Sequence, residues 1–370
     1  MPPDVLDLFT ELAAVPSPPG EERAVADIVM RYLRDCGLEV DEDGSGPEIG
    51  STMGNLYTRI EPTAEGEPLF LCAHLDTVPP TAAIEPVVED GVVRNAAATI
   101  LGADNKAAVA SMLEATRRAL AEGRPQAGIE LLFTPKEEVG LVGAYAFDHT
   151  RLRAKVGYVY DQAAPIGVVI LGAPFSQSME VTFHGRAAHS GMHPEDGRSA
   201  ILAAARAISE MRLGRVDEDS TANVGTIQGG TATNIVPEWC TFVAEARSQD
   251  ERKLADLVQE MQDAVTFAAG VAECDVETIL RKSYRGYRFA KGDHAVALAA
   301  DALARCGYSP TYDLSGGAAD ANVFNERGLA CVNLANGMTD IHTPAEHITV
   351  ADLEAMVDVT LALFDVALAQ

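Results

Sequence analysis

The chain has 370 residues, which suits two domains at about 100–200 residues each. Its 28 Lys and Arg against 55 Asp and Glu give a net charge of −27, and we find no basic stripe that could bind phosphates, so we do not expect a nucleic-acid partner. The acidic balance is typical of a soluble protein or of a salty cytoplasm, and it would also attract divalent cations.

The chain start and the cysteines favour a cytoplasmic protein with no membrane association. Residues 1–7 lack the basic region and apolar stretch of a signal peptide, and no run of about 18 apolar residues predicts a membrane span. The six cysteines form no CxxC pair and mostly lie inside apolar runs, which predicts free thiols in a reducing compartment. They are Cys36, Cys72, Cys240, Cys274, Cys306 and Cys331.

Helix and strand patterns alternate over the first part of the chain and predict an α/β fold with a mixed sheet covered by helices. The predicted helices are 4–15, 20–36, 105–122 and 139–147, and the predicted strands are 54–60, 69–74, 129–134, 156–160 and 166–171.

The pattern changes near Ala173 to the order β-α-β-β-α-β of a ferredoxin-like unit. Its predicted strands are 178–186, 222–228, 235–246 and 274–283, and its predicted helices are 198–212 and 250–270. Elements of the first kind then return, as helix 293–306, a glycine turn at 315–317, strand 329–334 and helix 350–368. We therefore predict a small domain, 177–287, inserted into a larger one made of 1–176 and 288–370.

Five short segments at predicted strand ends carry metal-binding or acid/base side chains. A pair of divalent ions about 3.5–4 Å apart needs a bridging carboxylate, His and carboxylate ligands on each ion, and a free carboxylate that moves protons. Open α/β sheets bind their ligands at strand ends. The segments are His74-Leu75-Asp76, Asp104-Asn105-Lys106, Glu137-Glu138, Asp161 and His342.

Each segment alone also has an ordinary structural interpretation. Asp104 could cap the helix that follows it, and Asp161 could form a turn. His74 and Asp76 lie on one side of a strand by alternation, so Asp76 can orient the imidazole, although such pairs also occur on surfaces. Only the joint occurrence of the segments predicts a two-metal hydrolase.

The adjacent acids Glu137 and Glu138 point in different directions, so one can bind a metal while the other remains free as a base. Of His342 and His347, we expect one to be a ligand. Motifs of competing enzymes are absent: the sequence has no HExxH, no Walker lysine loop, no GxSxG and no Rossmann glycine fingerprint.

This run of segments resembles the co-catalytic zinc metallopeptidase superfamily of peptidase T, carboxypeptidase G, aminoacylase and succinyl-diaminopimelate desuccinylase, over almost the whole chain. It is most similar to the peptidase T-like branch. The motifs that carry the resemblance are Ala73–Pro80, Ile100–Lys106, Glu137–Leu141, Ala187–Gly191 and Thr233–Pro237.

The resemblance implies a zinc-peptidase catalytic domain that binds two divalent ions per chain, with Zn²⁺ expected and Co²⁺ or Mn²⁺ compatible with the same ligands. It implies that Asp104 bridges both ions, that Asp76 orients His74 and that Glu137 is the base. The remaining ligands would be His74 and Asp161 on one ion, and Glu138 and His342 on the other.

The resemblance further implies that the inserted domain is a lid that also forms a homodimer, in which His189 reaches the partner's site and helps to stabilise the oxyanion. Asn234 and Arg247 match the family's substrate-binding pair, and a guanidinium can hold a carboxylate through two hydrogen bonds. Gly316 and Gly317 would form a tight turn that lets the backbone approach the substrate. The histidines without an assigned role are His184, His193 and His347.

Two departures from the peptidase T-like pattern concern the neighbourhood of the site. Asn105 stands where such chains often have a second Asp, at a position that is not a ligand. Residues 316–320 read Gly-Gly-Ala-Ala-Asp instead of Gly-Gly-Gly-Ser-Asp, and the added methyl groups affect the expected substrate preference.

The expected activity is that of an aminopeptidase on short peptides such as tripeptides. A carboxypeptidase or an N-acyl-amino-acid amidohydrolase would use the same machinery, and a non-catalytic dimeric binding protein would keep only the fold.

Overall fold

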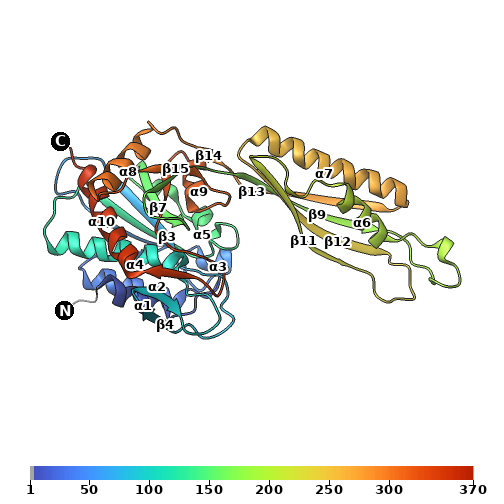
Figure 1. The fold of residues 1–370 in the computed structure, drawn as a ribbon, viewed down its shortest axis with the longest axis horizontal. Coiled ribbons are helices and arrows are strands. Elements are labelled where there is room, and N and C mark those ends of the chain that lie inside the picture. The colour runs from blue at the N-terminus through green and yellow to red at the C-terminus, as the bar shows by residue number, and fades with distance from the viewer. Residues whose placement is uncertain (1–3, 370) are drawn as a thin grey trace. The chain divides into compact units, whose positions relative to one another are not determined.

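A mixed sheet forms the centre of the first of two units in the computed structural model, which describes residues 4–369 (Figure 1). This unit contains the chain up to Gly172 and again from Arg288, and Ala173–Tyr287 form the second unit. The strands of the nine-stranded sheet are β1 Asp41–Glu42, β2 Leu56–Ile60, β3 Leu69–His74, β6 Ile129–Thr134, β7 Val156–Gln162, β8 Val168–Ala173, β14 Tyr287–Arg288, β15 Thr311–Leu314 and β16 Ala330–Ala335.

The strand order is β1-β2-β6-β3-β7-β16-β8-β14, with β15 beside β8. The central strands β6, β3, β7 and β16 run parallel to one another, whereas β2 and β8 are antiparallel to the strands that they flank. Every residue of β3 and β6 is buried. Parallel strands in the middle of a sheet are covered on both faces, which explains why they are continuous apolar runs in the sequence.

Helices cover both faces of this sheet. The helix α4, Ala103–Ala121, packs on β3 and β7, while α9, Asp320–Glu326, packs on β3, β7 and β16. The ring centres of Phe70 in β3 and Phe324 in α9 lie 4.9 Å apart. The next residue of the strand, Leu71, belongs to the core cluster that includes residues of α4. The other helices are α1 Val5–Ala13, α2 Arg23–Asp35, α3 Gly46–Ile49, α5 Val142–Ala146, α8 His294–Arg305, α10 Val350–Val366 and the 3-10 turn His149–Arg151.

The first unit also contains a separate three-stranded sheet, which was not predicted from the sequence. Its strands are β4 Pro86–Glu89, β5 Val92–Asn95 and β17 His347–Thr349, in the order β17-β5-β4. The strands are short and only partly buried, so they lack a clear apolar pattern. Through β17 the segment that follows His342 is fixed to residues 92–94.

The second unit has the predicted ferredoxin-like order, and its sheet is antiparallel throughout in the order β10-β11-β12-β9-β13. The helices α6 and α7 pack on each other and contact the sheet strands, with an apolar core between them and the sheet (Figure 1). The elements are β9 Phe175–His184, the 3-10 turn Pro194–Asp196, α6 Ala200–Glu210, β10 Gly214–Arg215, β11 Ser220–Gly229, β12 Trp239–Ser248, α7 Glu251–Ala272 and β13 Asp275–Tyr284.

Two predicted elements differ in extent for local reasons. The strand predicted at 235–246 begins only at Trp239, because Pro237 has no N–H to donate and Ile235 pairs with His189 instead. The helix predicted at 139–147 shrinks to α5, because Gly140 and Leu141 have positive φ values of 110° and 60° and form a turn. None of the helices in residues 4–369 is long and apolar enough to cross a membrane.

Candidate metal centre

The carboxyl ends of β3, β6 and β7 meet at one edge of the large sheet. His74 is the last residue of β3 and pairs in register with Thr134, the last residue of β6. Glu137 follows three residues beyond Thr134, and Asp161 lies near the end of β7. Because these parallel strands end together, side chains that are far apart in sequence gather at this edge.

The carboxylate of Asp104 lies between two imidazoles. Its Oδ1 is 3.2 Å from Nε2 of His74, and its Oδ2 is 3.1 Å from Nε2 of His342. Burial alone would raise the pKa of Asp104, but the hydrogen bonds from His342 and His74 lower it below its ordinary value. Each oxygen therefore faces a different ring, which is the arrangement expected of a carboxylate that bridges two ions.

Further carboxylates complete a group around each imidazole. Glu138 Oε1 lies 3.0 Å from His342 Nε2, and Asp161 Oδ1 lies 3.8 Å from His74 Nε2. Ligand atoms of His74, Asp104 and Glu138 lie within 4.8 Å of one another, as do those of His74, Glu137 and Asp161. The structure thus brings all five predicted ligands and the predicted base into one cluster.

Asp76 contacts His74 and the acidic pair by different atoms. The Nδ1 of His74 is 2.9 Å from the main-chain oxygen of Asp76 and 3.5 Å from its carboxylate. The carboxylate instead accepts hydrogen bonds from the main-chain N–H groups of Glu137, at 2.9 Å, and Glu138, at 3.1 Å. Asp76 therefore directs the His74 ring mainly through its carbonyl group and holds the turn of the acidic pair with its side chain.

Divalent cations fit this donor set. Burial, together with the charge of Asp104, raises the pKa of Asp161 to about 7, and burial raises the pKa of Glu137 well above its ordinary value. Buried carboxylates that crowd together are costly unless a cation neutralises them. Imidazole nitrogens combined with carboxylate oxygens are ligands that Zn²⁺, Co²⁺ and Mn²⁺ accept.

Three buried residues near the centre received no role from the sequence. Glu346 accepts three main-chain hydrogen bonds from the loop that contains Asp104. Lys106 donates to the Val15 carbonyl group, and burial lowers its pKa to about 7. Asp320 accepts a hydrogen bond of 2.6 Å from Thr134, beside the strand end of His74. Lys106 and Asp320 lie in segments singled out in the sequence, and Glu346 lies four residues after His342, but the sequence does not show what these side chains contact.

His189 lies in the second unit, in the segment after β9. Its Nδ1 accepts hydrogen bonds from the N–H groups of Gly191 and Met192, both at 3.2 Å. Nε2 then carries the proton of the neutral ring and is left to donate it to another molecule. The ring is exposed, and Ser190 donates to the carbonyl oxygen of Asn234 at 3.0 Å, so the His189 and Asn234 segments lie together.

Arg247 lies at the other end of the second unit's sheet from Asn234. It is near the end of β12, whereas Asn234 precedes the first residue of that strand, Trp239. From Trp239 to Arg247 the strand extends roughly 25 Å at about 3.3 Å per residue. The guanidinium binds Glu245 at 2.6 Å and lies 5.9 Å from the ring centre of Tyr284. One copy of this unit therefore does not bring the predicted substrate-binding pair together.

The turn at Gly316 and Gly317 leaves space around its backbone. A Cβ added at either glycine would meet no atom within 4 Å, and the N–H of Gly317 donates to Ser315 Oγ at 3.1 Å. Packing inside the chain therefore does not require glycine at these positions.

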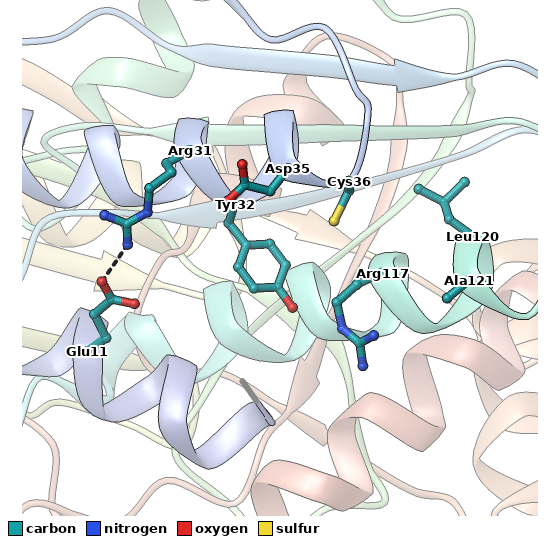
Figure 2. Close-up of a pocket in the computed structure, with 8 residues that line it drawn as sticks. All are labelled: Glu11, Arg31, Tyr32, Asp35, Cys36, Arg117, Leu120 and Ala121. Carbon is teal, nitrogen blue, oxygen red and sulfur yellow. Dashed lines mark hydrogen bonds and ion pairs between the residues drawn. The ribbon is translucent and has the colours of Figure 1, made fainter. Parts of the chain in front are cut away.

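A separate cavity of about 570 Å³ lies against α2 and α4 and contains none of the predicted site residues (Figure 2). Its Arg31 pairs with Glu11, and its Arg117 binds Glu114 at 2.7 Å. Both cations are thus already neutralised by carboxylates of the chain.

Comparisons with known proteins agree with this fold. Residues 175–273 match the model of the peptidase dimerisation domain, and residues 55–171 match that of peptidase family M28. The YqjE protein of Bacillus subtilis is 37% identical over 98% of both chains. Crystal structures of aminopeptidase PepT from Bacillus cereus and of a tripeptidase from Staphylococcus aureus share 37% and 34% identity, with TM-scores of 0.89 and 0.93, over 98% of both chains.

The fold and the site define a metallopeptidase with an inserted dimerisation domain, which confirms the predicted fold class and enzyme class. Within that class the chain belongs to the peptidase T-like family.

Proposed function

We propose that this chain is a two-metal aminopeptidase that removes the N-terminal residue from short peptides, with tripeptides as the preferred substrates. The proposal rests on the position of Asp104 between two histidines. Its carboxylate oxygens lie 3.2 Å from Nε2 of His74 and 3.1 Å from Nε2 of His342. The aminopeptidase and tripeptidase that share its fold at 37% and 34% identity support the substrate class.

In this proposal Asp104 would bind both ions, and the remaining ligands would divide between them. His74 and Asp161 would hold one ion, and Glu138 and His342 would hold the other. Zinc is the metal that we propose. Two such ions, when bound, polarise a carbonyl oxygen and lower the pKa of a water molecule.

Glu137 is the proposed general base. It is buried beside His74 and Asp161, and its main chain is held by Asp76 at 2.9 Å. It accepts a proton from the attacking water and later donates it to the leaving amine. Burial raises the pKa of its carboxyl group, which makes the carboxylate a better proton acceptor.

The second unit is proposed to form a homodimer. One edge of β11 pairs with β10 only at Thr221 and Ala222, and the rest of that edge has no partner strand among residues 4–369. Ile227 on this open stretch is 51% exposed. Open strand edges with apolar side chains are ready to pair with another chain.

A dimer also explains the separation of the substrate-binding pair. His189 and Asn234 lie together, while Arg247 pairs in register with Ser176, close to the point where the chain enters the second unit. We propose that Arg247 serves the site of its own chain and that His189 and Asn234 serve the partner's site. There the Nε2–H of His189 donates to the developing oxyanion. Closure of the second unit as a lid would exclude water.

The proposed location is the cytoplasm. The six cysteines are all free, which fits a reducing compartment.

The substrate class is tested by incubating the metal-loaded enzyme with free tripeptides, N-blocked tripeptides and N-acyl amino acids, and identifying the products by mass. Release of the N-terminal residue from free tripeptides alone supports the proposal. Cleavage of N-blocked tripeptides would indicate a carboxypeptidase, and cleavage of N-acyl amino acids would indicate an amidohydrolase. Glu137→Gln serves as the control for contaminating peptidases.

A further inference from the structure

Glu346 connects the two segments that contain Asp104 and His342. Its side chain is buried, and its carboxylate accepts hydrogen bonds from three main-chain N–H groups, two in the loop before α4 and one in the first turn of that helix. Oε2 accepts from Leu101 at 2.7 Å and from Gly102 at 2.9 Å, and Oε1 accepts from Asp104 at 2.9 Å. Both oxygens are therefore used to hold the backbone of residues 101–104.

The segment that supplies Glu346 is itself held by hydrogen bonds. The N–H of Glu346 donates to the Thr343 carbonyl at 3.1 Å, and the Thr343 hydroxyl donates to the Asp340 carbonyl at 2.7 Å, which closes the turn around His342. The next residue, His347, begins β17 and pairs with Arg94 of β5. The Glu346 carboxylate thus extends from an anchored turn.

This connection differs in kind from the direct contact between Asp104 and His342. That contact, at 3.1 Å, joins two proposed ligands of the same ion, so both side chains change partners when the ion binds. The hydrogen bonds of Glu346 go to main-chain N–H groups, which do not bind cations. Binding of an ion therefore does not require these hydrogen bonds to change partners.

We infer that Glu346 is a positioning residue that sets Asp104 and His342 at the separation required to bind a divalent ion. This inference rests on the proposed function, because it assumes that the centre binds metal. Residues that hold metal ligands in place typically affect metal affinity by about 10–100-fold. Glu346 does so through the main chain of Asp104 and through its own turn, without touching the ion.

Glu346→Gln is the informative variant, because it preserves the size of the side chain and removes one acceptor. The new NH₂ group must face either the N–H of Asp104 or those of Leu101 and Gly102. The side-chain NH₂ group and a main-chain N–H group then face each other as two donors, and the hydrogen bond at that position is lost.

Glu130→Gln is a matched control within the same unit. Glu130 is also buried, and its carboxylate likewise accepts main-chain hydrogen bonds, from Arg153 at 3.0 Å and from Ala154 at 2.8 Å. It lies near the start of β6, at the opposite end of the strand from the edge where the ligands gather. Its carboxylate also pairs with Arg59 at 3.1 Å, so its substitution removes an anchor of the fold at a place away from the ligands.

The experiment measures the dissociation constants of Zn²⁺ and Co²⁺ by competition with a chelator, and the absorption spectrum of bound Co²⁺, for the full chain and both variants. Circular dichroism and thermal unfolding show that each variant is folded. We expect Glu346→Gln to raise the dissociation constant of one of the two bound ions by about 10–100-fold and to change the Co²⁺ spectrum. We expect Glu130→Gln to retain the affinities and the spectrum of the unsubstituted chain.

Unchanged affinities in folded Glu346→Gln would overturn the inference alone, as would an equal loss in Glu130→Gln. An unsubstituted chain that fails to bind two ions would overturn the proposed function and the inference with it.

Discussion

The main-chain N–H of Glu137 donates to Oδ1 of Asp76 at 2.9 Å, joining the loop after β6 to the loop after β3. The neighbouring N–H of Glu138 donates to the other oxygen of the same carboxylate at 3.1 Å. Asp76 therefore holds a proposed base and a proposed ligand with a single side chain, while its carbonyl group accepts from His74.

Asp76→Asn tests this arrangement. The amide NH₂ must face one of the two N–H groups, so the turn of Glu137 and Glu138 shifts. We expect kcat to fall by about 10–100-fold in a folded protein. Kinetics on a free tripeptide, together with the metal content of the purified protein, provide the measurement. A variant with the original kcat would show that the Asp76 carboxylate does not position the pair.

Glu137→Gln and Glu138→Gln separate the roles of two adjacent acids. A general base typically accelerates a reaction by about 10²–10⁴-fold. Glu137→Gln should therefore lower kcat by at least about 10²-fold, and the variant should still bind both ions. Glu138 lies 3.0 Å from His342, so Glu138→Gln should instead weaken metal binding.

Metal analysis and kinetics on both variants check the assignment. If Glu137→Gln lost metal and Glu138→Gln kept it, the two roles would have to be exchanged.

The stability of the metal-free chain should depend on the protonation of His342. Hydrogen bonds to Asp104 and Glu138 raise the pKa of His342 from 6.5 to about 10. The protonated ring stabilises the folded state fully at pH values below 6.5, the pKa of histidine in the unfolded chain. This stabilisation is lost as the pH rises through about 10, the pKa in the folded chain. Metal affinity should rise over the same window, because an ion binds the neutral ring.

Denaturant unfolding of the metal-free chain and of His342→Asn, between about pH 6 and pH 10, measures this contribution. Lys106, whose pKa burial lowers to about 7, contributes a slope of the opposite sign in both proteins, so the difference between them isolates His342. Parallel pH curves for the two proteins would contradict the prediction.

Mixing two inactive variants tests whether His189 acts in the partner's site. His189→Ala and Glu137→Gln should each have very low activity as homodimers. In a mixed dimer, one site combines an intact Glu137 with an intact His189 of the partner subunit. With random exchange in a symmetric dimer, roughly a quarter of all sites become functional.

The matched control mixes His189→Ala with the double variant His189→Ala and Glu137→Gln, in which no site regains both residues. Tripeptide hydrolysis after subunit exchange is the readout. Equal activity in both mixtures would place His189 outside the partner's site, or show that the chains do not exchange.

The sequence by itself determined the order of the main helices and strands and the residues that gather at the sheet edge. Both follow from local chemistry, since buried parallel strands are continuous apolar runs and the polar residues after them lie at one edge. The alternating pattern of the inserted unit likewise predicted its β-α-β-β-α-β order.

Only the tertiary structure decided how these residues are held and which of them can act together. The hydrogen bonds of Glu346 to the loop of Asp104 and those of Asp76 to the acidic pair join segments that have no local signal for each other. The separation of Asn234 from Arg247 depends on where β12 begins, which the pairing of Ile235 with His189 sets. Such contacts between distant segments depend on packing, and a sequence pattern records only the neighbours along the chain.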